Sequence, residues 1–347
     1  MWGVVCCTSL STARAQPLAA DAAVFELRRD LTALVRRPGR AVWGVQVKDL
    51  DSGAVLFSHN AQLTFNPASN TKLLTMAAVL RELGHGRRLR TELLGTRRGD
   101  VVVGGLYLRG GFDPTLDTVD LRALARELRR RGVRRVAGPI YVDAGAFDGE
   151  PDPPGFRAFR SSHGYRAGVG SVCVDHNTMQ ITVAPAPAAG RPALVSVSPG
   201  SPYLRNIRGV VRTVRGRGGW LSVKTFRAGT GTGVRVTGRL GLGSPPRRVW
   251  RRVHHPWRFA AHVLVEQLVA VGIRARHRVG RRRVPRAARL LASHRSRPLV
   301  EIVRRATKYS SNVFAEHLLL AAGAERFGRP ATFAKGRRTL RAHLRRW

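Results

Sequence analysis

The chain has 347 residues and a formal net charge of +40, with 61 lysine and arginine residues against 21 acidic ones. This length allows two or three domains with well-buried cores. Such a charge favours anionic partners, either nucleic acid or envelope polymers. The arginines are scattered, however, and no aromatic-rich nucleic-acid motif accompanies them, which argues against a specific nucleic-acid-binding protein.

The N-terminus has the pattern of a signal peptide. A short apolar run over residues 1–10 precedes Ala13-Arg14-Ala15, and this Ala-x-Ala sequence predicts a signal segment 1–15 with cleavage after Ala15. The run is too short to span a bilayer. Cys6 and Cys7 would leave with the signal, so Cys173 would have no partner for an intrachain disulfide. A periplasmic or secreted protein is therefore expected.

A helix and a hairpin are predicted next. Asp21 can cap a helix in which apolar residues recur at roughly helical spacing as far as Val35. Residues 41–50 and 54–59 have the character of two strands, and Asp51-Ser52-Gly53 between them is typical of a turn.

The first candidate site is a Ser-x-x-Lys sequence formed by Ser69 and Lys72. Pro67 suits the start of a helix, and Gly84 suits its end. Positions i and i+3 share a helix face, so the serine hydroxyl and the lysine amine can meet. The amine could take the serine's proton if its pKa fell from about 10.4 towards about 7. The alternative for so short a pattern is a capped surface helix without chemistry.

The middle of the chain favours strands, because its apolar runs are short and bounded by glycine. An amphipathic helix is expected over 121–131, and an irregular loop over 151–170. The glycine-rich run 229–233 is not a phosphate loop, since neither Lys-Ser/Thr nor a helix follows it. Strands are predicted at 91–94, 101–103, 106–108, 136–142, 172–183, 193–197, 209–214, 219–223 and 233–240.

Three histidines invite a metal-site interpretation, but the spacing of His254, His255 and His262 matches no zinc pattern. We expect no metal and no cofactor. A helix over 258–271, a strand over 273–279 and a basic linker over 281–285 are predicted to follow.

The second candidate site is Ser310-Ser311-Asn312, which follows a predicted helix over 298–307 and opens another. Ser-x-x-Lys with a downstream Ser-x-Asn is the pattern of penicillin-recognising serine enzymes. The two serines, Ser69 and Ser310, are 241 positions apart, far more than a simple β-lactamase needs.

With these motifs and the sequence of residues 106–116, the chain from about Val24 onward resembles the class C low-molecular-mass penicillin-binding proteins. That family comprises D-alanyl-D-alanine carboxypeptidases and endopeptidases of peptidoglycan. The resemblance implies an α+β fold, in which a penicillin-binding-protein/β-lactamase-like serine transpeptidase domain carries two nested, mostly β inserted domains. The implied division is a catalytic domain over 22–92 and 290–347, a first insert over 93–175 and 250–289, and a second insert over 176–249.

The resemblance also implies roles for individual residues. Ser69 would attack the carbonyl of the penultimate D-alanine, with Lys72 as the base. Ser310 would relay a proton to the leaving amine, and Asn312 would hold the substrate amide. Tyr165 stands where the family often has a tyrosine near the substrate, although a packed structural tyrosine is equally consistent. Peptidoglycan stem peptides would be the substrates and β-lactams the inhibitors, with peripheral association to the envelope.

One family motif is absent. No Lys-Thr-Gly occurs, and the chain stops 35 residues after Asn312, whereas Lys224-Thr225-Phe226 lacks the glycine and precedes the second motif. We therefore expect a C-terminally truncated member with an incomplete catalytic sheet. The resemblance implies that the Lys-Thr-Gly strand supplies one donor of the oxyanion hole. Poor or absent acylation is therefore expected as well, since the loss of one such donor alone lowers the rate by about 10²–10³. The alternative is an inactive relative that binds an envelope polymer.

Overall fold

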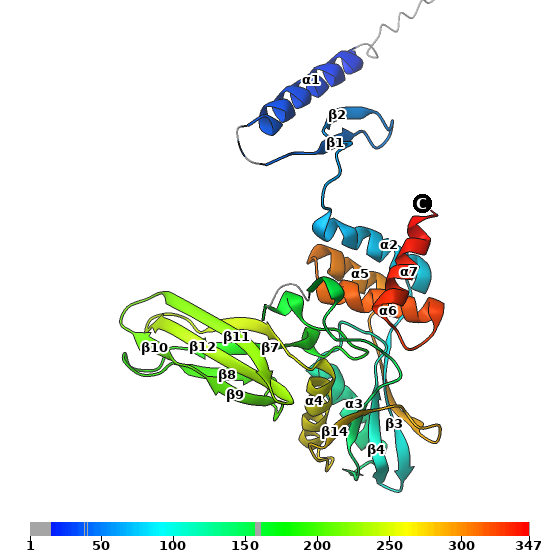
Figure 1. Ribbon diagram of the computed structural model, residues 1–347, viewed down its shortest axis with the longest axis vertical. Helices are drawn as coiled ribbons and strands as arrows, with labels where there is room; N and C mark the ends of the chain where they lie inside the picture. The colour runs from blue at the N-terminus through cyan, green and yellow to red at the C-terminus, as the bar shows by residue number, and fades with distance from the viewer. Residues whose placement is uncertain (1–14, 38, 40, 157–160, 347) are drawn as a thin grey trace, which may run out of the picture. The chain divides into compact units, whose positions relative to one another are not determined.

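The computed structural model describes residues 15–37, 39, 41–156 and 161–346. The predicted signal peptide therefore lies almost wholly outside the described residues. The chain divides into two compact units, Met1–Ala68 and Ser69–Trp347, and each is considered by itself. Figure 1 labels helices and strands of both units where there is room.

The first unit contains one helix and one hairpin. Helix α1 (Ala15–Val35) starts before the predicted cap at Asp21, and β1 (Val45–Lys48) pairs antiparallel with β2 (Val55–His59). The hairpin turn is closed by Asp49, whose carboxylate accepts from the backbone N and the hydroxyl of Ser52, both at 2.6 Å. Phe57 is the one hydrophobic side chain of this unit that is buried among the described residues. This unit therefore has only a small core, and a two-stranded hairpin has little stability of its own.

Four helices of the second unit share one core. They are α2 (Thr71–Leu83), α5 (Leu299–Lys308), α6 (Asn312–Phe327) and α7 (Phe333–Leu344). Met76 and Val79 of α2 pack in the same buried cluster as Leu318 of α6. Helix α7 was not predicted from the sequence. Its close approach to α6 depends on two glycines, since a Cβ on Gly323 would lie 2.6 Å from the backbone N of Gly336.

A six-stranded sheet forms the centre of the second unit. Its order is β14-β6-β4-β3-β15, with the short β5 also paired to β4. Helices α3 (Thr118–Arg130) and α4 (Pro256–Ala270) pack against it through a common hydrophobic core. The strands are β3 (Arg90–Arg98), β4 (Val101–Arg109), β5 (Arg135–Val136), β6 (Ile140–Asp143), β14 (Val279–Arg282) and β15 (Arg289–Arg295).

Two predictions about this sheet are wrong. The strand expected over 273–279 is instead β14, which begins at Val279, so the basic residues Arg281 and Arg282 are strand rather than linker. Apolar and basic residues alternate before Val279, but pairing with the edge of β6, Val279 opposite Ile140, decides where the strand lies. The strand expected over 136–142 is divided into β5 and β6 by three intervening residues.

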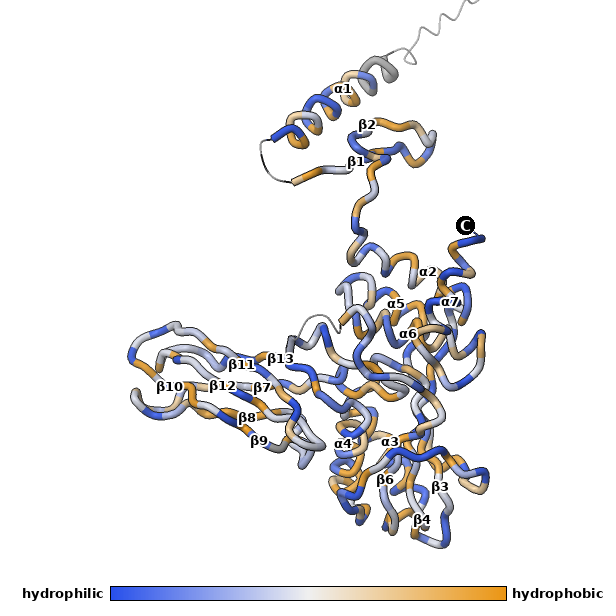
Figure 2. Tube along the Cα trace, in the orientation of Figure 1, coloured by the Kyte–Doolittle hydropathy of each residue, from blue (hydrophilic) through white to orange (hydrophobic). Residues whose placement is uncertain are grey.

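Two smaller sheets complete the second unit (Figure 1). One has the order β13-β7-β8, and the other has the order β10-β12-β11 with β9 also paired to β12. Hydrophobic and hydrophilic residues alternate along their strands in Figure 2, as expected for strands with one buried face. Ile181 and Val183 of one sheet share a core with Val223, Val234 and Val236 of the other. The strands are β7 (Thr178–Ala184), β8 (Leu194–Ser198), β9 (Leu204–Arg208), β10 (Val211–Val214), β11 (Gly219–Ala228), β12 (Gly231–Gly241) and β13 (Arg247–Arg252).

This mixed architecture with several sheets confirms the predicted α+β class. The boundaries of the two nested inserts stay a prediction. Among the described residues, no helix is both long enough and apolar enough to span a membrane.

The start of α3 offers a test of local stability. Asp117 caps the helix by accepting from the backbone N of Asp120 at 2.9 Å, and Asp120 accepts in return from the backbone N of Asp117 at 3.1 Å. Replacing Asp117 with alanine should lower the free energy of unfolding by about 1 kcal/mol, because the cap is lost. Urea denaturation measures the change. Asp117→Asn keeps a good capping group and should lose clearly less, so equal losses in both variants would contradict this account.

Candidate active site

The first predicted pair of residues is in hydrogen-bond contact. Ser69 lies in a single 3-10 turn (Ala68–Asn70) directly before α2, rather than in the helix as predicted. Lys72 follows in the first turn of α2, and its Nζ donates to the Ser69 Oγ at 2.9 Å. Ser69 is exposed and Lys72 is half-buried, so the hydroxyl is open to a substrate while the amine is partly shielded from water.

The turn between α5 and α6 brings Ser310 to the same amine. The Lys72 Nζ lies 3.5 Å from the Ser310 Oγ. Helix α5 ends in a Schellman pair, in which the N–H of Ser310 donates to Thr307 O at 3.2 Å and that of Ser311 to Ala306 O at 3.0 Å. This ending requires a left-handed residue, and Ser310 has φ of 50°. Glycine usually occupies such a position, so a serine there carries backbone strain.

Opposing effects act on the Lys72 amine. Burial lowers its pKa because the neutral form needs less solvation, and the carboxylate of Glu316 partly offsets this. Glu316 lies on α6, one turn after Asn312, and its own pKa is raised by burial. The net result is a lysine whose pKa is below its ordinary value. Such an amine loses its proton more readily and can act as a base.

Asn312 and Tyr165 are also neighbours. The Asn312 Nδ2 donates to the backbone carbonyl of Tyr165 at 3.1 Å, and no described residue donates to its Oδ1. The Tyr165 ring is 60% exposed and stacks on His163 with ring centroids 5.4 Å apart. The packed-tyrosine interpretation is therefore wrong. The structure places an open aromatic ring beside Asn312, whose amide oxygen is free to accept from a ligand.

A cleft extends from this cluster. It has a volume of about 610 Å³ and is bounded by the α5–α6 turn, the segment around Tyr165 and strand β13. The sequence interpretation missed three of its lining residues, Trp250, Arg248 and Arg305. Trp250 is 53% exposed, and this exposure indicates a binding residue only once β13 is known to face the second motif.

Two other reactive groups do not belong to this site. His317 is fully buried, which lowers its pKa to about 4. Its Nδ1 is hydrogen-bonded to the carbonyl oxygen of Val313 at 2.7 Å. A neutral, internally bonded imidazole of this kind is a structural group. Cys173 is likewise buried, and burial raises the pKa of its thiol well above the ordinary value. It is therefore unreactive, as expected for a small core residue.

Comparison with known proteins gives consistent matches. The sequence profile of the D-Ala-D-Ala carboxypeptidase 3 (S13) family matches residues 27–347. A D-alanyl-D-alanine carboxypeptidase from an Actinomadura species is 34% identical over 90% of this chain and 61% of its own length. The D-alanyl-D-alanine carboxypeptidase DacB of Haemophilus influenzae is 22% identical over 87% of this chain and 63% of its own length. The chain thus spans about three fifths of these relatives.

Solved structures support the fold. Penicillin binding protein 4 (dacB) from Haemophilus influenzae superimposes with a TM-score of 0.77 at 23% identity, over 92% of this chain and 70% of that one. A second structure of that protein, complexed with a β-lactam, gives a TM-score of 0.71. These matches confirm the predicted penicillin-binding-protein fold.

The effect of Glu316 on Lys72 can be measured directly. Because the Glu316 carboxylate raises the pKa of Lys72, replacing it with glutamine should lower that pKa further. An NMR titration of the Lys72 side-chain carbon next to the amine reports the shift. Glu325→Gln is the matched control, since it removes the same charge from the same helix beside Arg87 instead. A Lys72 pKa that rises in Glu316→Gln, or shifts equally in both variants, would refute the proposed coupling.

Proposed function

The chain belongs to the D-Ala-D-Ala carboxypeptidase 3 (S13) family, and on that basis we propose a serine-type D-alanyl-D-alanine carboxypeptidase/endopeptidase that acts on peptidoglycan stem peptides. The observation that carries this proposal is the position of the Lys72 amine, 2.9 Å from the Ser69 hydroxyl and 3.5 Å from that of Ser310. A nucleophile, its base and a second hydroxyl are thus within reach of one another.

The proposed reaction proceeds through an acyl-enzyme. Neutral Lys72 takes the proton of Ser69 as its oxygen attacks the carbonyl carbon of the penultimate D-alanine. The proton then passes by way of Ser310 to the nitrogen of the terminal D-alanine, the C–N bond breaks and that residue leaves. Water next attacks the ester on Ser69, and the second product leaves with its carboxylate. The lowered pKa of Lys72 favours the neutral form that the first step needs.

The cleft beside the second motif suits a peptide ligand. Asn312 would hold a substrate amide through its free Oδ1. Tyr165 and Trp250 offer exposed rings along the cleft, and Arg248 and Arg305 offer positive charge to the carboxylates of a stem peptide. β-Lactams would acylate Ser69, since they present a reactive carbonyl to the same nucleophile.

The cellular setting belongs to this proposal. A stem-peptide substrate requires a periplasmic or secreted location, and the net charge of +40 suits peripheral association with an anionic envelope. We also propose that residues 93–175 with 250–289, and residues 176–249, are the two nested inserts. The separate small sheets formed by β7 to β13 support the second of these.

Covalent labelling tests the proposed nucleophile. Prolonged incubation with fluorescent penicillin should give a slow adduct, which mass spectrometry of the digested protein should locate on Ser69. Ser69→Ala should abolish the adduct. Lys72→Ala should slow its formation by about 10² or more, because the base is lost. Lys308→Ala is the matched control, since it removes an exposed lysine beside the second motif.

Each other outcome has a clear meaning. An adduct that persists in Ser69→Ala, or equal rates in the two lysine variants, would contradict the mechanism. A wild-type chain that forms no adduct but binds penicillin saturably would favour the inactive polymer-binding relative.

Ser310 allows strain and chemistry to be separated. Ser310→Gly and Ser310→Ala both remove the hydroxyl, so both should slow acylation by about 10². Only glycine relieves the left-handed backbone, so Ser310→Gly should exceed Ser310→Ala in free energy of unfolding by about 1 kcal/mol. Labelling rates and urea denaturation measure the two effects. Normal labelling in either variant would remove Ser310 from the proton path.

A further inference from the structure

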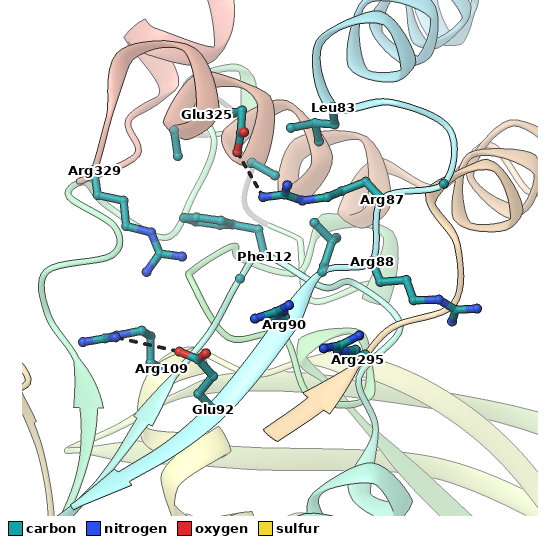
Figure 3. Close-up of a pocket in the computed structure, with 15 residues that line it drawn as sticks. Leu83, Arg87, Arg88, Arg90, Glu92, Arg109, Phe112, Arg295, Glu325 and Arg329 are labelled. Atoms are coloured by element: carbon teal, nitrogen blue, oxygen red, sulfur yellow. Dashed lines mark hydrogen bonds and ion pairs between the residues drawn. The ribbon is translucent and has the colours of Figure 1, made fainter. Parts of the chain in front are cut away.

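A second cavity lies at the opposite end of α2 from Ser69. It has a volume of about 770 Å³ and is lined by the last residue of α2, the connection into β3, the end of β4, the end of α6 and Arg329 (Figure 3). Helix α2 has 13 residues, and its rise of 1.5 Å per residue separates the two ends by about 20 Å. This cavity is therefore distinct from the catalytic cluster and its cleft.

The cavity is strongly basic. Six arginines and two glutamates line it, which leaves four positive charges uncompensated within the lining. Like charges gathered around one space repel each other, and the repulsion grows where protein displaces water. The charged lining residues are Arg87, Arg88, Arg90, Arg109, Arg295, Arg329, Glu92 and Glu325.

Three of the arginines have partners. Arg87 pairs with Glu325 at 3.2 Å, and Arg88 donates to the Ser296 carbonyl at 2.8 Å. Arg109 pairs with Asp143 at 2.9 Å and lies 3.8 Å from Glu92.

The other three have no such partner. Arg90, Arg295 and Arg329 make no side-chain hydrogen bond or ion pair with any residue that the structure describes. These guanidinium groups and that of Arg109 surround the same space in Figure 3. Arg90, Arg295 and Arg329 come from β3, β15 and the segment after α6, so separate parts of the fold present to one cavity guanidinium groups that have no partner among the described residues.

Arg329 is the arginine of this cavity whose charge the surrounding protein disfavours. It retains exposed surface toward the cavity, yet the surrounding protein lowers the pKa of its guanidinium, and the nearby charge of Arg109 lowers it further. The carboxylates of Asp143, Glu92 and Glu325 oppose this effect without overcoming it. An anion bound between Arg329 and Arg109 would offset both the loss of hydration at Arg329 and the repulsion between the two guanidinium groups.

The backbone beside the cavity is tightly constrained. A Cβ on Gly111 would lie 2.5 Å from the carbonyl oxygen of Arg90, and one on Gly110 would lie 1.9 Å from that of Ser171. Only glycine permits these approaches. The following residue, Phe112, is 2% exposed, so its ring forms a buried wall of the cavity. The backbone of Arg90 is therefore packed closely against the segment that leads into Phe112.

We propose that this cavity binds the diphosphate group of a phosphorylated ligand. Guanidinium forks pair two donors with two phosphate oxygens, and a diphosphate supplies enough charge to meet several arginines at once. A single carboxylate carries one charge and would leave most of the donors unpaired. The volume of about 770 Å³ exceeds that of a diphosphate, which leaves room for the molecule that carries it.

Calorimetric titration with inorganic pyrophosphate at constant ionic strength tests this site. One pyrophosphate should bind per chain, and Arg329→Ala and Arg90→Ala should each weaken binding about 10-fold or more. Arg126→Ala is the matched control. It removes one charge from an exposed cluster on α3 that also contains Arg122, Arg129 and Arg130, and it should change the affinity less than about 2-fold.

The same experiment separates the sources of the diphosphate. A short alkyl diphosphate ester that binds more tightly than pyrophosphate identifies a group on a larger molecule, whereas equal binding identifies free diphosphate, and both results support the site. Circular dichroism confirms folding, and the exposed Arg295→Ala replaces Arg329→Ala if that variant unfolds. Equal weakening by Arg126→Ala, or binding without saturation, would overturn the proposal, because either would reflect the net charge alone.

Discussion

The protonation state of the Lys72 amine is the constraint on which the candidate site depends. Burial favours the neutral base, whereas the nearby Glu316 carboxylate favours the charged form, and burial prevails. This balance requires α2 and α6 to remain in register. Met76 and Val79 of α2 share a buried core with Leu318 of α6, and close packing of this kind resists shifts of one helix against the other. The buried apolar contacts of the two helices therefore help to set the acidity at the site.

The second motif depends on a different property of the backbone. Ser310 reaches Lys72 because α5 ends in a left-handed residue and α6 begins two residues later with Ser311 as its cap. A glycine would be less strained there but would supply no hydroxyl. The strain is therefore the cost of placing a side chain at a helix end, and the two Schellman hydrogen bonds offset part of it.

Local spacing predicted the parts of the site that depend on one helix turn. Ser69 and Lys72 are three residues apart, and the 3-10 turn that leads directly into the first turn of α2 brings them together. Spacing could not reveal that Asn312 donates to the carbonyl of Tyr165, 147 residues away, because that contact depends on how whole segments pack. The misplaced strand before β14 has the same origin. Alternation marks a segment that can pair, but the free edge of β6 selects which residues do.

Arginine content alone locates no site in a chain with a net charge of +40. Exposed arginines such as Arg126 on α3 extend into water. Screening and hydration there make the electrostatic environment of one arginine similar to that of the next. Arg329 differs because burial by the surrounding protein and the nearby charge of Arg109 lower the pKa of its guanidinium, so a bound anion would stabilise its charged form. The same desolvation that lowers the pKa of Lys72 thus acts near the other end of α2. It favours loss of a proton where the cation is an amine. It favours capture of an anion where the cation is a guanidinium, which does not give up its proton.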